Sequence, residues 1–329
     1  NTAVGARSLQ ANTTAANNVA VGDLALGANT TGTRNTAVGT NALDANTTDT
    51  DNTAVGYNAL TSAAGAYYTV GVGTYAGEDL TTGVENSFLG YASGRDTTTG
   101  AYNTAVGSTA FSLNTTGGSN TAVGRAALIN NTTADNNTAV GMNAMYGNTT
   151  GANNTAVGYN ALTANTTGYA LVALGRTALE DNTTGAANVA VGQNALANNT
   201  TASNNIAIGL EALYTNTTGA QCIAIGGGAA AASNISNTLA IGYSALNDLT
   251  TGARNVAIGN YALDTTQSGS NSVAVGYAAG DAVTTASSLV LVGDVAGDAI
   301  TTSSNCVAVG AGALTTHATG SGNTAIGKS

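Results

Sequence analysis

The sequence contains no proline or tryptophan, one histidine and two cysteines among 329 residues, and only 7% of its residues are charged. Histidine- or cysteine-based catalysis therefore has few residues available. Seven Lys and Arg against 17 acids give a net charge of −10, which argues against the clustered cations that neutralise nucleic-acid phosphates. No run of 18 or more apolar residues predicts a membrane span. We expect neither nucleic-acid binding nor a transmembrane helix.

The chain consists instead of one repeated unit of 17 residues, and Asn154–Gly168 shows its common form, NTAVGYNALTANTTG. The glycine that closes the first five residues occurs 20 times at steps of 17, except for one step of 16 between Gly226 and Gly242. A fixed period of this size is typical of a solenoid, in which each unit packs on its neighbours. We predict a single continuous parallel β-solenoid or β-roll over residues 1–329, with a one-residue deletion in the repeat at 222–237.

Comparison of the copies, numbered from the leading Asn as position 1, predicts the role of each position. Position 3 is almost always Ala, and position 4 is always Val, Ile or Leu. Because neighbouring strand residues face opposite sides, we expect position 3 to line a narrow interior and the position 4 face to be covered by a second sheet or a partner chain. We expect Asn at position 1 to form an inward ladder of amides along the stack. Thr-Thr at positions 13 and 14 predicts a second strand, and Gly at positions 5 and 15 predicts turns with positive φ.

Positions 9 and 12 vary together. Position 9 is usually Leu and position 12 usually Asn, but four copies have Gly at position 9 and a different residue at position 12. These pairs are Gly77 with Leu80, Gly94 with Thr97, Gly280 with Val283, and Gly297 with Ile300. Volume lost at one position is mostly regained at the other, so we predict that both share one core compartment.

The two cysteines, Cys222 and Cys306, each replace the Asn at position 1. They lie five repeats apart, or roughly 24 Å at about 4.8 Å per stacked coil. A disulfide requires Cα atoms within about 7 Å, so the two cannot pair within one solenoid. We interpret them as buried small hydrophobic residues.

The first strand resembles a known pattern. Asn271–Gly276 (NSVAVG) and Asn205–Gly209 (NIAIG) are similar to the head repeats of trimeric autotransporter adhesins, the YadA-like family. The resemblance implies a left-handed parallel β-roll, three chains around one axis, and a role in adhesion at a bacterial cell surface. The 17-residue unit is longer than the usual repeat of that family, and its Asn-Thr-Thr-Gly half departs from the family's pattern.

We expect no enzymatic activity, no metal site and no cofactor. His317, the only histidine, lies at position 12 with no Ser or Cys partner placed beside it, so we interpret it as a structural substitution. Adjacent acids such as Glu78–Asp79 and Glu180–Asp181 are not accompanied by a repeating Asp ladder or a calcium-binding repeat. They fit solvated turns.

Two groups of surface residues are candidate binding or modification sites. Tyrosines recur at position 6, on a predicted turn, where exposed rings could hold a glycan or a host surface or could shield the edge of the coil. They are Tyr57, Tyr91, Tyr159, Tyr243 and Tyr277. Ten copies carry the N-glycosylation pattern Asn-Thr-Thr, although the pairing of positions 9 and 12 argues that these Asn face inward. They are Asn12, Asn29, Asn46, Asn114, Asn131, Asn148, Asn165, Asn182, Asn199 and Asn216.

Low charge with abundant Thr, Asn, Gly and Ala suits an extracellular structural protein. We predict a non-enzymatic fibre, or the head or shaft of an adhesin, that acts by rigid stacking of repeats and by surface adhesion. Its partners would be further copies of the chain, as a homotrimer or an end-to-end filament, and a glycan or host-surface ligand. The alternatives are a self-assembling, N-glycosylated extracellular filament, an ice-binding protein using the threonines of positions 13 and 14, and a phage tail fibre.

Overall fold

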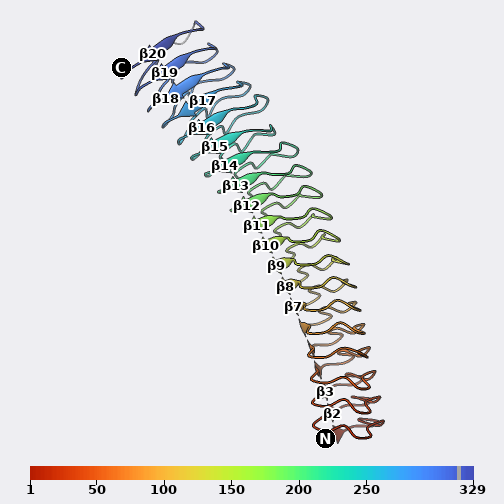
Figure 1. Ribbon diagram of the computed structural model, residues 1–329. Coiled ribbons are helices and arrows are strands. Elements are labelled where there is room, and N and C mark those ends of the chain that lie inside the picture. The colour runs from red at the N-terminus through yellow and green to blue at the C-terminus, as the bar shows by residue number, and fades with distance from the viewer. Residues whose placement is uncertain (317–319) are drawn as a thin grey trace. The chain divides into compact units, whose positions relative to one another are not determined.

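The computed structural model describes residues 1–316 and 320–329, as two compact units of residues 1–167 and 168–329 (Figure 1). The first unit contains β1 (Thr2–Val4), β2 (Val19–Val21), β3 (Thr36–Val38), β4 (Thr53–Val55), β5 (Val70–Val72), β6 (Ser87–Leu89), β7 (Thr104–Val106), β8 (Thr121–Val123), β9 (Thr138–Val140) and β10 (Thr155–Val157). The second contains β11 (Val172–Leu174), β12 (Val189–Val191), β13 (Ile206–Ile208), β14 (Ile223–Ile225), β15 (Leu239–Ile241), β16 (Val256–Ile258), β17 (Val273–Val275), β18 (Val290–Val292), β19 (Val307–Val309) and β20 (Thr324–Ile326). No helix occurs in the described residues, and the predicted all-β solenoid is confirmed. Continuity of the array from one unit to the other stays a prediction.

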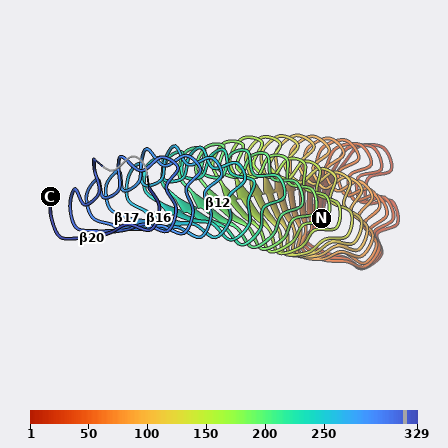
Figure 2. The ribbon, with the colours of Figure 1, turned by 90° about the horizontal axis from the view of Figure 1, so that it is seen from above.

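Within each unit, every strand pairs in parallel with the equivalent strand one repeat later. Ala20 of β2 lies opposite Ala37 of β3, and Ala190 of β12 lies opposite Ala207 of β13. Parallel strands need a crossover connection, which the rest of the repeat supplies. Each coil thus adds one rung to a parallel sheet, and Figure 2 shows successive coils of each unit one behind the other. Within the described residues, no helix is long and apolar enough to cross a membrane.

The strand ends at the position 5 glycine, whose φ lies between +129° and +143° in all 20 copies. A Cβ on Gly192 would also lie 2.5 Å from the carbonyl oxygen of Gly209 in the next coil, so no side chain fits. Positive φ was predicted at position 15, but it occurs there at Gly320, with φ +103°, and not in most copies, such as Gly185. A Cβ on Gly185 would approach the carbonyl oxygen of Ala202 to 2.3 Å, so a small residue is needed there for close packing of coils.

Two further left-handed residues shape the first turn. In the common form these are positions 7 and 9, such as Asn160 with φ +53° and Leu162 with φ +56°. A left-handed leucine is strained, yet Leu162 is fully buried, so core packing holds it in place. Gly77 and Gly94 at position 9 have the same left-handed φ of +58° without that strain.

The predicted second strand at positions 13 and 14 is wrong, because the two residues share one acceptor. The backbone N–H groups of Thr115 and Thr116 both donate to the carbonyl oxygen of Thr132, at 2.8 and 3.2 Å. The Thr115 hydroxyl donates to the same oxygen at 3.0 Å. A parallel ladder uses evenly spaced, separate bonds, so this segment forms stacked bends instead of a strand.

The inward Asn ladder at position 1 is present, but its partners are mainly backbone groups instead of other amides. Asn103 Nδ2 donates to the Gly117 carbonyl at 3.0 Å, and Asn103 Oδ1 accepts the N–H of Asn120 at 3.0 Å. The amide therefore ties its own coil closed and bonds to the next coil. Amide-to-amide bonds instead recur at position 12, where Asn131 Nδ2 donates to Asn114 Oδ1 at 3.0 Å.

The shared compartment of positions 9 and 12 is confirmed, and position 3 also contributes to it. Leu80, Thr97, Val283 and Ile300 are all fully buried. The large exceptions at position 3 are also buried, Phe88 in the first unit and Leu291 in the second. A Cβ on Gly94 would lie 2.4 Å from Phe88, and one on Gly280 would lie 2.5 Å from Leu291. Position 9 is therefore glycine because a large residue at position 3 fills its space.

The one-residue deletion is absorbed in the second half of its repeat without a change of strand register. Ile223 of β14 still pairs with Leu239 of β15. In the common coil, the backbone carbonyl of position 13 accepts bonds from the Thr-Thr segment of the preceding coil. In the shortened repeat, a side-chain oxygen takes the place of this carbonyl. Asn234 Oδ1 accepts the N–H groups of Thr217 and Thr218 at 3.0 and 2.8 Å. A side-chain amide thus substitutes for the acceptor that the deletion removes.

Candidate functional sites on the outer surface

The outward strand face, formed by positions 2 and 4, is a repetitive apolar surface in each unit. Its side chains are half-buried to exposed, with Val157 39% and Ile208 38% exposed. No second sheet occurs in the described residues to cover this face. The covering of position 4 by a partner chain stays a prediction.

The strand faces of the two units differ in polarity. In the first unit position 2 is mostly Thr, as in Thr121 and Thr138, whereas β11 to β19 of the second unit have only Val, Ile or Leu at both outward positions. Comparison of single positions across the repeat did not predict this division. The signal was present, because the change from Thr to aliphatic residues falls between Thr155 and Val172.

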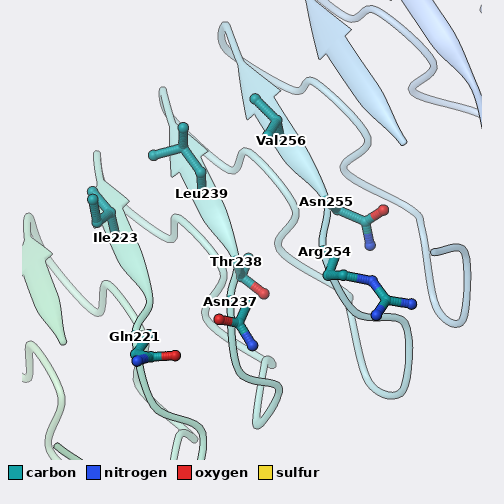
Figure 3. Close-up of a pocket in the computed structure, with 8 residues that line it drawn as sticks. All are labelled: Gln221, Ile223, Asn237, Thr238, Leu239, Arg254, Asn255 and Val256. Carbon is teal, nitrogen blue, oxygen red and sulfur yellow. The ribbon is translucent and has the colours of Figure 1, made fainter. Parts of the chain in front are cut away.

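The aliphatic face of the second unit contains a shallow hollow of about 350 Å³ near the deletion. Ile223, Leu239 and Val256 extend from consecutive strands β14, β15 and β16 to the same side (Figure 3). Polar residues line its other edge, namely Gln221, Asn237, Thr238, Arg254 and Asn255. Arg254 is held by its neighbour, since its Nε donates to Asn271 Oδ1 at 2.8 Å. The hollow is an open depression that is continuous with the aliphatic strand face.

Four of the five predicted tyrosines belong to two ladders of three rings each, one in each unit. In the first, Tyr75 lies between Tyr57 and Tyr91, with ring centroids 5.5 and 6.0 Å apart and planes at 85° and 79°. In the second, Tyr261 lies between Tyr243 and Tyr277, at 5.5 and 5.9 Å with planes at 77° and 85°. Edge-to-face contacts of this geometry are favourable for aromatic pairs. Each ladder thus orders its own rings on the surface.

The ladders depend on a pattern over three consecutive repeats that single-position comparison does not show. Tyr occupies position 6, then position 7, then position 6 again. Because neighbouring coils are one strand spacing apart, this alternation brings the rings into contact. Tyr159 is exposed on the same turn, but no ring among the described residues pairs with it.

The asparagines of the glycosylation pattern face inward. All except Asn12, which is half-buried in the first coil, are fully buried. Asn148 Nδ2 donates to Asn131 Oδ1 at 3.1 Å and to the Gly151 carbonyl at 3.0 Å. A glycan could be attached to such a side chain only before the coil folds around it.

The threonines proposed for ice binding have different environments. The position 13 hydroxyl bonds to the next coil, as Thr149 Oγ1 does to the Thr166 carbonyl at 3.0 Å. The position 14 side chain is exposed, as at Thr116 and Thr150. The structure therefore presents one rank of free-standing threonines on this surface instead of two.

Both cysteines are free and buried, as predicted. They also replace the donor of the Asn ladder, because Cys222 Sγ lies 2.9 Å from the Ile235 carbonyl and Cys306 Sγ lies 3.8 Å from the Gly320 carbonyl. Burial raises the pKa of the Cys222 thiol. A thiol that is buried and kept protonated fits a structural role.

Carboxylates stack on one turn of the second unit. Burial raises the pKa of Asp264 to about 6, and the charges of Asp281 and Asp248 add to this shift. Burial and Asp298 raise the pKa of Asp281 as well. Among the described residues no group of three or more His, Cys, Asp or Glu is placed to hold a metal ion. His317 lies outside the described residues.

No protein-family model matches this chain, and no curated protein is significantly similar to it. The similarity to trimeric autotransporter heads therefore rests on the repeat residues themselves.

Proposed function

We propose that this chain is a structural segment of an extracellular fibre or adhesin, non-enzymatic, which acts as a rigid scaffold that presents one surface many times. The observation that supports the proposal best is the uninterrupted register of hydrogen-bonded coils within each unit. Side-chain amides bond to the neighbouring coil at position 1 and at position 12. Stability in such an array comes from interfaces between neighbouring coils, so a long regular surface can be built without a globular core.

The strand face supports self-association as part of this function. Its ridges repeat at the strand spacing of about 4.8 Å, and a second copy of the same solenoid is a surface with the same period. Val, Ile and Leu at both outward positions of β11 to β19 supply the kind of apolar side chains that form the core of a stable interface. We propose a homotrimer, as the resemblance to autotransporter heads implies, with end-to-end filaments as the alternative arrangement.

The low charge and the abundance of Thr, Asn, Gly and Ala favour an extracellular, cell-surface location. Such a location also fits a protein whose two thiols are buried and whose surface has no reactive cysteine among the described residues. A protease-accessibility assay on intact source cells tests this part. Release of repeat fragments into the medium would support it, and complete protection until the cells are lysed would contradict it.

Native mass by light scattering, with electron microscopy of the same sample, tests the assembly. A particle near three times 31.7 kDa supports the trimeric scaffold, and long filaments support the filament alternative. A strictly monomeric protein over a wide concentration range would contradict both. Intact-mass spectrometry tests the alternative of a glycosylated filament. Because the asparagines of the glycosylation pattern are buried, we expect the mass of the unmodified polypeptide.

A further inference from the structure

We propose that the two tyrosine ladders are binding sites for a linear, neutral polysaccharide of β-linked pyranose units that lies along the stack of coils. This inference rests on the adhesive role proposed above and names the ligand class. In each ladder the two position 6 rings, Tyr57 with Tyr91 and Tyr243 with Tyr277, would stack on alternate sugars.

The position 6 rings are available to a ligand. Tyr57 and Tyr91 are 46% and 54% exposed, and Tyr243 and Tyr277 are 55% and 54% exposed. Their phenol groups leave a large apolar surface in water at turn positions where most copies carry a small or polar residue. The axial C–H face of a pyranose is a flat apolar partner for such a ring, and the phenol hydroxyl can bond to sugar hydroxyls.

The spacing of these rings fits a linear chain. Both members of a pair occupy position 6 of coils two repeats apart, so they are separated by roughly 9–10 Å at 4.7–4.9 Å per coil. This distance is close to the length of two β-1,4-linked pyranose units, in which every second sugar presents the same face. An extended polysaccharide parallel to the stack can therefore contact both rings without bending.

The coil between the two rings supplies the rest of the site. Its position 6 holds a short polar residue, Thr74 in the first ladder and Asn260 in the second. Its position 7 holds the central Tyr75 or Tyr261, which packs edge-to-face on both outer rings. Rings that are fixed before binding lose little freedom when the ligand arrives.

The same arrangement occurs once in each unit, which argues against chance placement of single tyrosines. The third coil of each ladder also has Ala at position 7, Ala92 or Ala278, beside the last outer ring. A net charge of −10, with Glu78 accepting a bond from Asn58 near the first ladder, disfavours sulfated or acidic glycans. Neutral polysaccharide is therefore the ligand class.

Isothermal titration with cellohexaose and with N-acetylchitohexaose tests the proposal, and α-linked maltohexaose serves as the curved comparator. We expect at least one β-linked hexasaccharide to bind at two sites per chain, and maltohexaose to bind at least about tenfold more weakly. The variant Tyr57→Ala/Tyr91→Ala should retain one site. Adding Tyr243→Ala/Tyr277→Ala should weaken binding by at least about tenfold, since two stacking contacts are lost at each site.

Two control variants separate the ladders from tyrosines in general. Tyr57→Phe/Tyr91→Phe keeps the rings and should retain the first site within about threefold. Tyr159→Ala/Tyr169→Ala removes exposed rings outside the ladders, 47% and 59% exposed, and should change nothing. An unchanged circular dichroism spectrum and a cooperative melt of every variant confirm that the coils are intact.

Absence of binding by both β-linked sugars, equal binding of maltohexaose, or full affinity in the fourfold alanine variant would each overturn the inference. An equal loss in the Tyr159→Ala/Tyr169→Ala variant would do the same. None of these results changes the native mass of the particle, so failure of the ligand proposal is distinguishable from failure of the scaffold proposal.

Discussion

At position 5 of the repeat, the backbone conformation and the next coil together exclude any side chain. Gly192 has φ +130°, and its Cβ position lies 2.5 Å from a carbonyl oxygen. Position 15 excludes a side chain less strictly, because φ is ordinary there in most copies, such as Gly185, and Ala occupies it in others, such as Ala134 and Ala202. The two glycine positions therefore differ in physical cause.

We expect Gly192→Ala to destabilise the protein by roughly 1–3 kcal/mol through backbone strain, with further loss from the contact to Gly209. Gly185→Ala, at position 15 of the preceding repeat, is the matched control and should cost clearly less. Thermal unfolding followed by circular dichroism measures both. Equal losses would show that close packing of the coils, and not φ, decides both positions.

Asp264 is a residue whose ionisation opposes folding, because burial raises its pKa. Its folded pKa is about 6 against an ordinary 3.8, so the folded state binds more protons than the unfolded state between about pH 4 and pH 6. Stability is therefore lost as the pH rises through this window, and the loss is complete above the folded pKa. One buried oxygen of this carboxylate, Oδ1, also has no hydrogen-bond partner.

Asp264→Asn should raise the melting temperature at pH 7 and have little effect at pH 4. The Asp264 carboxyl group is costly to bury only when it is ionised, and the amide carries no charge at either pH. Asp181→Asn, on an exposed turn, is the control, and its effect on the melting temperature should be the same at both pH values. Thermal melts at pH 4 and pH 7 measure the difference. The same shift at both pH values would assign the effect to hydrogen bonding and not to charge.

At the scale of one coil, the core conserves volume across three positions. Phe88 fills the space that Leu occupies at position 9 elsewhere, which is why Gly77 and Gly94 lie against its ring. The strand itself is short because the position 5 Gly ends it. In the bend at positions 13 and 14, two backbone N–H groups share one carbonyl acceptor. One coil is therefore a strand, a left-handed turn and a bend, closed by buried amides.

Phe88→Ala should open a cavity and cost about 3–5 kcal/mol. Restoring the common residues in the same coil, as Phe88→Ala/Gly94→Leu/Thr97→Asn, should recover most of this loss, because Leu and Asn refill the compartment. Urea unfolding midpoints of the three proteins provide the measurement. A triple variant no more stable than Phe88→Ala would contradict the shared compartment.

At the scale of the molecule, the aliphatic strand face of the second unit is where we propose that copies of the chain meet. Ile225 on β14 is 37% exposed and lies among aliphatic neighbours in register. A lysine there would place a charge in the centre of any interface formed by this face.

Ile225→Lys should therefore lower self-association by at least about tenfold without loss of the fold, whereas Gln193→Lys, on an exposed turn, should leave it unchanged. Analytical ultracentrifugation over a concentration series measures both. Unchanged association of the Ile225→Lys variant would place the interface elsewhere on the molecule.

The sequence alone determined the repeat, the strand at positions 2 to 4, the inward Ala, the buried amides and the shared compartment of positions 9 and 12. These follow from period and alternation, because 20 copies of one unit report which side-chain volumes each position accepts. Even the inward Asn of the glycosylation pattern was readable, from its exchange with Leu80, Val283 and Ile300.

Only the tertiary structure decided which groups of neighbouring coils meet. The second strand was replaced by a bend because two N–H groups reach one carbonyl, and position 15 was small because of a neighbour's oxygen. The tyrosine ladders required Tyr75 and Tyr261 to lie against rings of the adjacent coils. Contacts between coils depend on stacking distance and direction, which a one-dimensional period does not contain.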